Sequence, residues 1–324
     1  MTACFKTASV PTEPVQPVSR QTVSRQTGLL NDDVVIDGHR IATGRHGPPE
    51  GRPVLLIHGT PSHSHIWRHI VPPLTAAGYR VHLFDMLGYG ASERPWAADT
   101  SIAAQEALVP ALLAAWGLSR VTLVGHDLGA ATGLRVAVNR PEILDGLMMI
   151  DGVAFDSWPS PTWQAIIRDH FDRYMAMSET AFREMLTRQL RMTVHNSARM
   201  PDALLESYLA PLSGPIGQAS FFHHQVRHYD SRHTRELTPH LGRIDLPRPV
   251  RLLWGAEDAW QPVPAVAHPL AAAIPGADLR LIPDAGHFAM EDAPEAVTDQ
   301  ILAFLPRPTT CRACCGLDPA LAPH

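Results

Sequence analysis

Residues 125–129, Gly-His-Asp-Leu-Gly, constrain the fold of this chain more than any other segment. The apolar run 121–124 before them predicts a strand, and the small and apolar residues 130–137 after them predict a helix. A turn this sharp from strand to helix requires glycine on both sides of its central residue, because a nearby Cβ atom would collide with the backbone. The pattern predicts that Asp127 is presented at the end of a strand, at the tip of a strand–turn–helix unit.

The chemistry of Asp127 narrows the function. An aspartate side chain has a pKa near ~3.9, so it is an anion at neutral pH and needs no base to act as a nucleophile. Carboxylate attack on an ordinary ester would give a high-energy anhydride, whereas attack on an sp3 carbon with a leaving group gives a stable alkyl ester. Asp127 therefore favours displacement of a halide or of the strained oxygen of an epoxide. The alternative is that it only caps the helix that follows.

Two later strand ends carry the partners that such a nucleophile needs. The apolar run 251–255 leads to Asp258, and the run 279–282 leads to His287. His287 is predicted to be the general base, and Asp258 is predicted to hold its imidazole in the correct tautomer. A structural role is the alternative for His287, since the chain contains 18 histidines.

The segment 58–61, His-Gly-Thr-Pro, follows another apolar run that predicts a buried strand. A glycine turn at a strand end can point a backbone N–H into a site, so the N–H groups of Thr60 and Leu128 are predicted to form an oxyanion hole. This hole would serve the second step, in which water activated by His287 attacks the carbonyl carbon of the Asp127 ester. A plain strand-to-helix turn is the alternative.

Together these motifs resemble the α/β-hydrolase superfamily, specifically its haloalkane dehalogenase and epoxide hydrolase branch. The resemblance covers about residues 30–305 and rests on the segments 58–61, 84–92, 125–129, 254–258 and 286–287. It implies a mostly parallel, eight-stranded α/β-hydrolase sheet flanked by helices, with an inserted helical cap. The roles that it implies are Asp127 as nucleophile, His287 as base, Asp258 as acid, and Thr60 and Leu128 as oxyanion donors.

The resemblance leaves the acid and the leaving-group device open. Some haloalkane dehalogenases carry the acid one strand earlier, after the strand that follows the helix behind the nucleophile. This chain has Asp151 at that place, although Asp258 fits the more common position. Haloalkane dehalogenases also usually have Asn and Trp where this chain has Thr60 and Leu128, and a leucine cannot donate to a halide. The carboxylate-clamping arginines of haloacetate dehalogenases are absent beside Asp127. Epoxide hydrolases need an acid in the lid, for which the candidates are Tyr174, Tyr208, Tyr229, His223 and His224.

Alternating strand and helix patterns predict one α/β core with its site at the carboxyl ends of the strands. Among its helices, the patterns predict one that starts at Trp67 and one over residues 263–273. We expect residues 1–27 to be a disordered leader, 28–154 and 241–305 to form the core, 155–240 to form the helical cap, and 306–324 to be a disordered tail. Cys311, Cys314, Cys315 and His324 in this tail match no standard zinc spacing, so no metal is expected.

Composition is that of an ordinary enzyme: 324 residues, 45% of them hydrophobic, with a net charge of −5. The charge argues against a nucleic-acid partner, and no apolar run approaches the ~18 residues of a membrane span. No signal peptide is recognised, so a cytoplasmic location is expected.

The prediction is a cofactor-free hydrolase, with an epoxide as the first choice of substrate. A haloalkane dehalogenase-like enzyme is the first alternative, and its substrate would also be a small apolar molecule with an sp3 leaving group. An ester or lactone hydrolase is a further alternative, as is a non-catalytic ligand-binding relative. Asp127, Asp258 and His287 together argue against the last, because a binding protein has no need of all three.

Overall fold

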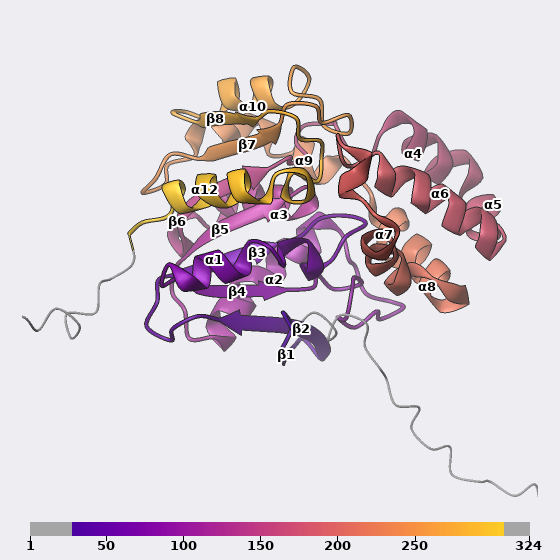
Figure 1. Ribbon diagram of the computed structural model, residues 1–324, viewed down its shortest axis with the longest axis horizontal. Coiled ribbons are helices and arrows are strands. Elements are labelled where there is room, and N and C mark those ends of the chain that lie inside the picture. The colour runs from indigo at the N-terminus through magenta and orange to yellow at the C-terminus, as the bar shows by residue number, and fades with distance from the viewer. Residues whose placement is uncertain (1–27, 308–324) are drawn as a thin grey trace, which may run out of the picture.

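The computed structural model describes residues 28–307, and within them eight strands form one sheet in the order β1-β2-β4-β3-β5-β6-β7-β8 (Figure 1). The strands are β1 (Asp32–Ile36), β2 (His39–His46), β3 (Pro53–Ile57), β4 (Arg80–Phe84), β5 (Val121–His126), β6 (Leu144–Ile150), β7 (Arg251–Gly255) and β8 (Asp278–Ile282). β2 pairs antiparallel with both β1 and β4, and the other neighbours are parallel. The predicted fold class, a mostly parallel eight-stranded sheet, is therefore confirmed.

Helices cover both faces of this sheet. α1 (Val71–Ala76) and α12 (Pro294–Phe304) pack together on one face, and α2 (Ile102–Ala115) and α3 (Leu128–Asn139) pack together on the other (Figure 1). Every residue of β5 is buried, which explains why this central strand is an uninterrupted apolar run in the sequence. The remaining helices of the core are α10 (Ala267–Ala273) and α11 (Ala289–Asp292).

Two helices begin later than the sequence suggests. The helix expected from Trp67 starts at Val71, after a short 3-10 turn at Ser64–Trp67. Pro72 and Pro73 occupy the first turn of α1, the one place in a helix where a missing N–H costs nothing. The helix expected from Val263 likewise starts at Ala267.

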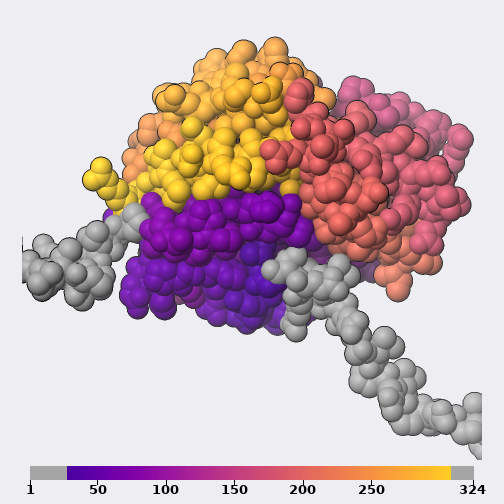
Figure 2. Space-filling model, viewed as in Figure 1, coloured from indigo at the N-terminus to yellow at the C-terminus, as the bar shows by residue number. Residues whose placement is uncertain are grey.

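Residues 155–240, which we call the helical insertion, lie between β6 and β7 in the chain and beyond the carboxyl ends of the parallel strands (Figure 1). Its helices are α4 (Pro161–Ala165), α5 (Phe171–Met175), α6 (Glu179–Arg191), α7 (Asp202–Leu209), α8 (Gly214–Ser220) and α9 (Arg232–Arg235), with π-helical turns at Ile166–His170 and Phe221–Gln225. On the face shown in Figure 2, side chains of the insertion meet those of the chain's first and last thirds.

The predictions for the termini concern the leader 1–27 and the tail 306–324, and only residues 306 and 307 of these lie in the described part of the chain. The undescribed residues include Cys4, Cys311, Cys314, Cys315 and His324. These predictions remain expectations. Within residues 28–307, no helix is both long and apolar enough to cross a membrane.

Candidate active site

The turn after β5 has the geometry that its glycines predict. Asp127 has φ 51° and ψ −114°, a strained conformation for a residue with a side chain, and it stands directly before α3. A Cβ atom on Gly125 would lie 2.3 Å from the carbonyl oxygen of Gly129, and one on Gly129 would lie 2.3 Å from that of Ile57. The two glycines therefore allow β5, α3 and the end of β3 to approach closely. The result is an Asp127 side chain at the N-terminus of α3, where the helix dipole stabilises a negative charge.

The side chains of Asp127, Asp258 and His287, from the ends of β5, β7 and β8, lie in contact, with His287 between the two carboxylates. Nδ1 of His287 lies 2.9 Å from Oδ2 of Asp258, and Nε2 of His287 lies 3.4 Å from Oδ2 of Asp127. All three residues are buried. Asp258 also accepts hydrogen bonds from the N–H groups of Trp260 and Gln261, at 2.7 and 2.9 Å. Asp258 is therefore fixed, and it fixes one side of the imidazole while the other side faces Asp127.

The two carboxylates determine the charge of His287. Burial alone lowers the pKa of this histidine, but Asp258 and then Asp127 raise it by more, so its pKa lies well above the ordinary value. The pKa of Asp258 is lowered, because contact with His287 outweighs the cost of burial. The negative charges of Asp258 and Asp127 thus favour the imidazolium form of His287.

The backbone N–H of Thr60 donates to Oδ1 of Asp127 at 2.7 Å. This contact requires Gly59, because a Cβ atom at position 59 would lie 2.4 Å from Oδ1 of Asp127. Leu128 is the first residue of α3, so its N–H has no acceptor within the helix. The two predicted oxyanion donors thus flank Asp127, and the Thr60 N–H already contacts its carboxylate.

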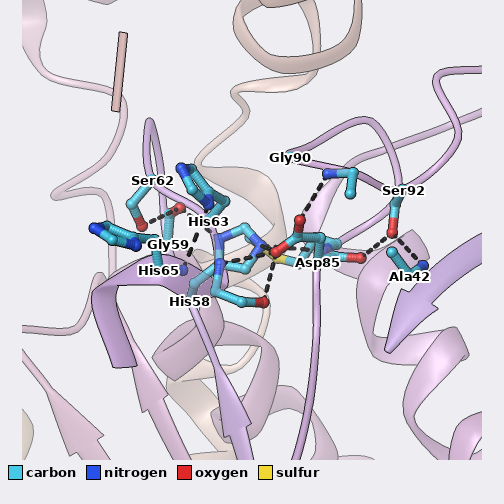
Figure 3. A network of polar contacts seen from close by, with 12 residues as sticks. Ala42, His58, Gly59, Ser62, His63, His65, Asp85, Gly90 and Ser92 are labelled. Carbon is cyan, nitrogen blue, oxygen red and sulfur yellow. Dashed lines mark hydrogen bonds and ion pairs between the residues drawn. The ribbon is translucent and has the colours of Figure 1, made fainter. Parts of the chain in front are cut away.

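A buried polar network lies behind the loop that carries Thr60 (Figure 3). Asp85 accepts hydrogen bonds from the N–H and hydroxyl of Ser64 and from the N–H of Ala91. The backbone N–H of Met86 donates to Nε2 of His58, which lies 3.9 Å from Asp85. Burial lowers the pKa of His58. This network joins the ends of β3 and β4 and holds the loop in place.

The loop of His287 is held by the end of β5 and by the helical insertion. Nε2 of His126 lies 2.9 Å from the carbonyl oxygen of His287, and burial lowers the pKa of His126 to about 3, so His126 is neutral and donates this bond. Oδ2 of Asp292 accepts from the N–H groups of Gly286 and His195, at 2.8 and 2.7 Å. His126 and Asp292 are positioning residues that the sequence analysis missed.

Asp151 is buried beside Asp258 but does not replace it. Oδ1 of Asp151 accepts the N–H of Gly255 at 2.7 Å, and no hydrogen bond joins Asp151 to the imidazole in the described structure. Burial and then the charge of Asp258 raise the pKa of Asp151 well above its ordinary value.

A cavity opens onto Asp127 and His287. Most of its wall is aromatic or apolar. It is lined by Thr60, Pro61, Asp127, Trp158, Trp163, Gln189, Thr193, Phe221, Tyr229, Trp260, Gln261 and His287. A mostly apolar wall of this kind suits a small, mostly apolar molecule.

The family model of the alpha/beta hydrolase fold matches residues 52–294. The chain belongs to this family. An alpha/beta hydrolase fold protein from Burkholderia ambifaria has a similar structure, with a TM-score of 0.78, 33% sequence identity, and coverage of 85% of this chain and 97% of that one. A haloalkane dehalogenase from Mycolicibacterium paratuberculosis is 29% identical over 272 residues, which are 80% of this chain and 85% of the relative. The 2-hydroxy-6-oxo-6-(2'-aminophenyl)hexa-2,4-dienoic acid hydrolase of Metapseudomonas resinovorans is 26% identical over 80% of this chain and 85% of its own length. The superfamily indicated by the sequence motifs is confirmed, and the haloalkane dehalogenase relative supports the predicted dehalogenase-like branch.

Of the five proton-donor candidates in this alpha/beta hydrolase, Tyr229 lines the cavity. Its hydroxyl lies 2.7 Å from the hydroxyl of Thr60. The hydroxyl of Tyr208 donates to Glu291 instead. Burial raises the pKa of Tyr229 well above its ordinary value, so it keeps its proton at neutral pH.

The other three candidates also do not line the cavity. His223 stacks on Trp96, with ring centroids 3.5 Å apart, and its Nε2 lies 2.6 Å from the Trp96 carbonyl oxygen. His224 contacts the carbonyl oxygen of Pro95, and Tyr174 packs against the hydrophobic core. The polar atoms of Tyr208, His223 and His224 thus have other partners. Tyr229 is therefore the candidate that we carry forward, and a donor role for any of the five stays a prediction.

Sequence analysis also missed the tryptophans of the cavity. Trp158 and Trp260 line it, and their indole N–H groups are buried without a hydrogen-bond partner. Both follow strand ends that carry an acid, Asp151 and Asp258, and this position was the available signal. Unpaired buried donors beside a nucleophile can bind an acceptor group of a ligand. Within residues 28–307, no group of His, Cys, Asp and Glu is arranged to hold a metal.

Proposed function

We propose that this alpha/beta hydrolase uses Asp127 as a nucleophile on an sp3 carbon and hydrolyses the resulting ester with water activated by His287. The observation that carries the proposal is the position of the imidazole of His287, with Asp258 on Nδ1 and Asp127 on Nε2. Oδ1 of Asp127 accepts the Thr60 N–H, and Oδ2 faces the imidazole of His287, so we assign the attack to Oδ2.

The preferred substrate is a small apolar epoxide. In the first step, Oδ2 of Asp127 bonds to a ring carbon, the carbon–oxygen bond breaks, and the leaving oxygen takes the hydroxyl proton of Tyr229. Asp127 is then a neutral ester, so the pKa of His287 falls and the imidazolium releases a proton. The proton released by His287 goes to the Tyr229 phenolate, so that Tyr229 is a phenol again and His287 is neutral before the second step.

In the second step, neutral His287 takes a proton from water, and the hydroxide attacks Cγ of Asp127. The negative charge on Oδ1 is stabilised by the N–H groups of Thr60 and Leu128. The bond from Cγ to Oδ2 breaks, and the departing diol oxygen takes a proton from His287. The oxygen from water stays in the Asp127 carboxyl group, and the proton of that group returns to His287.

We expect Tyr229→Phe to reduce diol formation from a small terminal epoxide by roughly 10²–10⁴-fold, because the general acid is lost. Tyr89→Phe is the matched control. Tyr89 is a buried tyrosine that also bonds to the Thr60 side chain but does not line the cavity, so its loss should cost far less. Diol formation is measured beside bromide release from 1-bromoalkanes of the same size. Equal activity of the two variants on epoxides would contradict the role of Tyr229.

Dehalogenation is the second candidate, and the unpaired indole N–H groups of Trp158 and Trp260 favour it. Two unpaired N–H donors in the wall of one cavity can hold a departing halide, in place of the side-chain donor that Leu128 lacks. Bromide release without diol formation, lost in Trp158→Phe and Trp260→Phe but kept in Tyr229→Phe, would establish this function over the first.

Asp258→Asn is expected to lower the hydrolysis rate by on the order of 10⁴-fold, because an amide reverses the preferred tautomer of the histidine. Asp151→Asn should cost far less, since Asp151 does not contact the imidazole. Single-turnover kinetics of both variants measure this difference. The reverse ranking would assign the acid to Asp151.

A further inference from the structure

The proposed mechanism gives Asp151 no role, although Asp151 lies next to Asp258, the acid that the mechanism uses. It follows β6 as Asp258 follows β7, and these strands pair in parallel with Ile150 opposite Leu253. The N–H of Asp151 donates to the carbonyl oxygen of Leu253, and its Oδ1 accepts from Gly255, so the residue is tied to β7 at two points. Its φ of 45° is unusual for a residue with a side chain.

An ionised Asp151 carboxylate would have too few hydrogen-bond donors and no cation beside it in the described residues. Its side chain is fully buried, and as a carboxylate its Oδ2 has no hydrogen-bond donor. No cationic side chain forms an ion pair with it in the described residues, and the charged groups that face it are Asp258 and, beyond that, His287. Two buried carboxylates side by side cannot both ionise at low cost, so one of them holds a proton.

The donors around the two acids decide which one holds it. Asp258 accepts three hydrogen bonds, from Trp260, Gln261 and His287, and such donors stabilise a carboxylate. Asp151 accepts one, from Gly255, and its buried Oδ2 has no donor in the described structure, although the charge of Asp258 acts on this carboxyl group. The hydrogen-bond donors therefore favour a negatively charged carboxylate at Asp258 and a protonated carboxyl group at Asp151.

We infer that Asp151 is a neutral carboxylic acid that donates a hydrogen bond to the Asp258 carboxylate, so that both acids together present a single negative charge to His287. Asp151 is then a positioning residue. It holds the carboxylate of Asp258 in place, and it limits the charge facing an imidazole that must become neutral in the second step. A second full negative charge there would keep His287 protonated and unable to activate water.

The inference rests on the proposed function for its catalytic part, but its protonation part is tested without substrate. With ¹³Cγ-labelled aspartate, the signal missing from Asp151→Asn is that of Asp151. In the wild type we expect this signal to be that of a protonated acid at pH ~7, where ordinary carboxyl groups are ionised. In Asp258→Asn it should titrate at lower pH, because the neighbouring negative charge is gone. An ionised Asp151 at neutral pH in the wild type would overturn the inference.

Kinetics of two substitutions test the catalytic part. Asp151→Asn keeps an acceptor for Gly255 and a donor for Asp258, so the hydrolysis rate should stay within about threefold of wild type. Asp151→Ala removes both, so we expect at least a tenfold loss, with His287 titrating at higher pH because Asp258 loses a donor. Equal losses of rate in the two variants, or an unchanged His287 titration in Asp151→Ala, would contradict the inference. Asp151 would then only fill space in the core. If no Asp127 ester forms in any variant, the proposed function fails while both titrations still test the protonation of Asp151.

Discussion

Asp127→Ala is expected to abolish turnover of epoxides and alkyl halides alike. The variant has no oxygen to form the ester, and no other carboxylate lines the cavity in the described structure. Asp127→Asn should be equally inactive, although its amide oxygen can still accept the Thr60 N–H and keep the loop in place. Turnover is measured as diol or halide release at saturating substrate.

Two measurements separate lost chemistry from lost structure in these variants. The melting temperature of Asp127→Asn should stay close to that of the wild type. The pKa of His287 should fall in Asp127→Ala, because one of the two carboxylates that raise it is gone. Full activity of a folded Asp127→Ala would contradict the mechanism.

His287→Gln is expected to stop the enzyme after the first step, at the Asp127 ester. The first step needs the Asp127 carboxylate and a proton for the leaving group, and neither comes directly from the imidazole. The second step needs a base for water, which glutamine cannot supply at neutral pH. A burst of one equivalent of halide from an alkyl halide, or of consumed epoxide, should therefore precede a near-zero steady state.

His126→Gln is a matched control for this substitution. His126 is also a buried histidine and contacts the carbonyl oxygen of His287, but it does not line the cavity. We expect it to slow both steps modestly and to leave steady turnover measurable. A steady state in His287→Gln as fast as that in His126→Gln would mean that His287 is not the base.

The positions of Asp127, Asp258 and His287 at strand ends were predictable from sequence, because local rules govern them. Gly125 and Gly129 are forced by the close approach of β5, α3 and β3, so the turn is visible in the residues themselves. Apolar runs locate the ends of buried strands, and parallel strands place those ends at one edge of the sheet.

The choice between Asp258 and Asp151 was not decidable in this way. Both follow buried parallel strands, and the difference is which carboxylate meets Nδ1 of His287 and which meets Gly255. That difference depends on side-chain directions in irregular loops, which no periodicity in the sequence records.

Predicting the wall of the cavity was harder still. The helical insertion contains several tyrosines and histidines, and what distinguishes Tyr229 is packing between segments far apart in the chain. Tyr208 pairs with Glu291, and His223 stacks on Trp96, so their side chains are committed elsewhere. For Trp158 and Trp260, the one signal in the sequence is their position after the strand ends that carry Asp151 and Asp258.

Covalent trapping on His287→Gln tests the central claim most directly. The variant is incubated with saturating epoxide or 1-bromoalkane, digested, and analysed by mass spectrometry, with Asp127→Asn treated in parallel. The mechanism predicts one substrate-derived adduct per chain, on Asp127, and none in Asp127→Asn. In wild type, a single turnover in ¹⁸O-labelled water should place the label in Asp127 and not in the product. An unmodified Asp127 peptide in His287→Gln, from substrates that the wild type turns over with the label entering the product directly, would contradict the claim that Asp127 is the nucleophile.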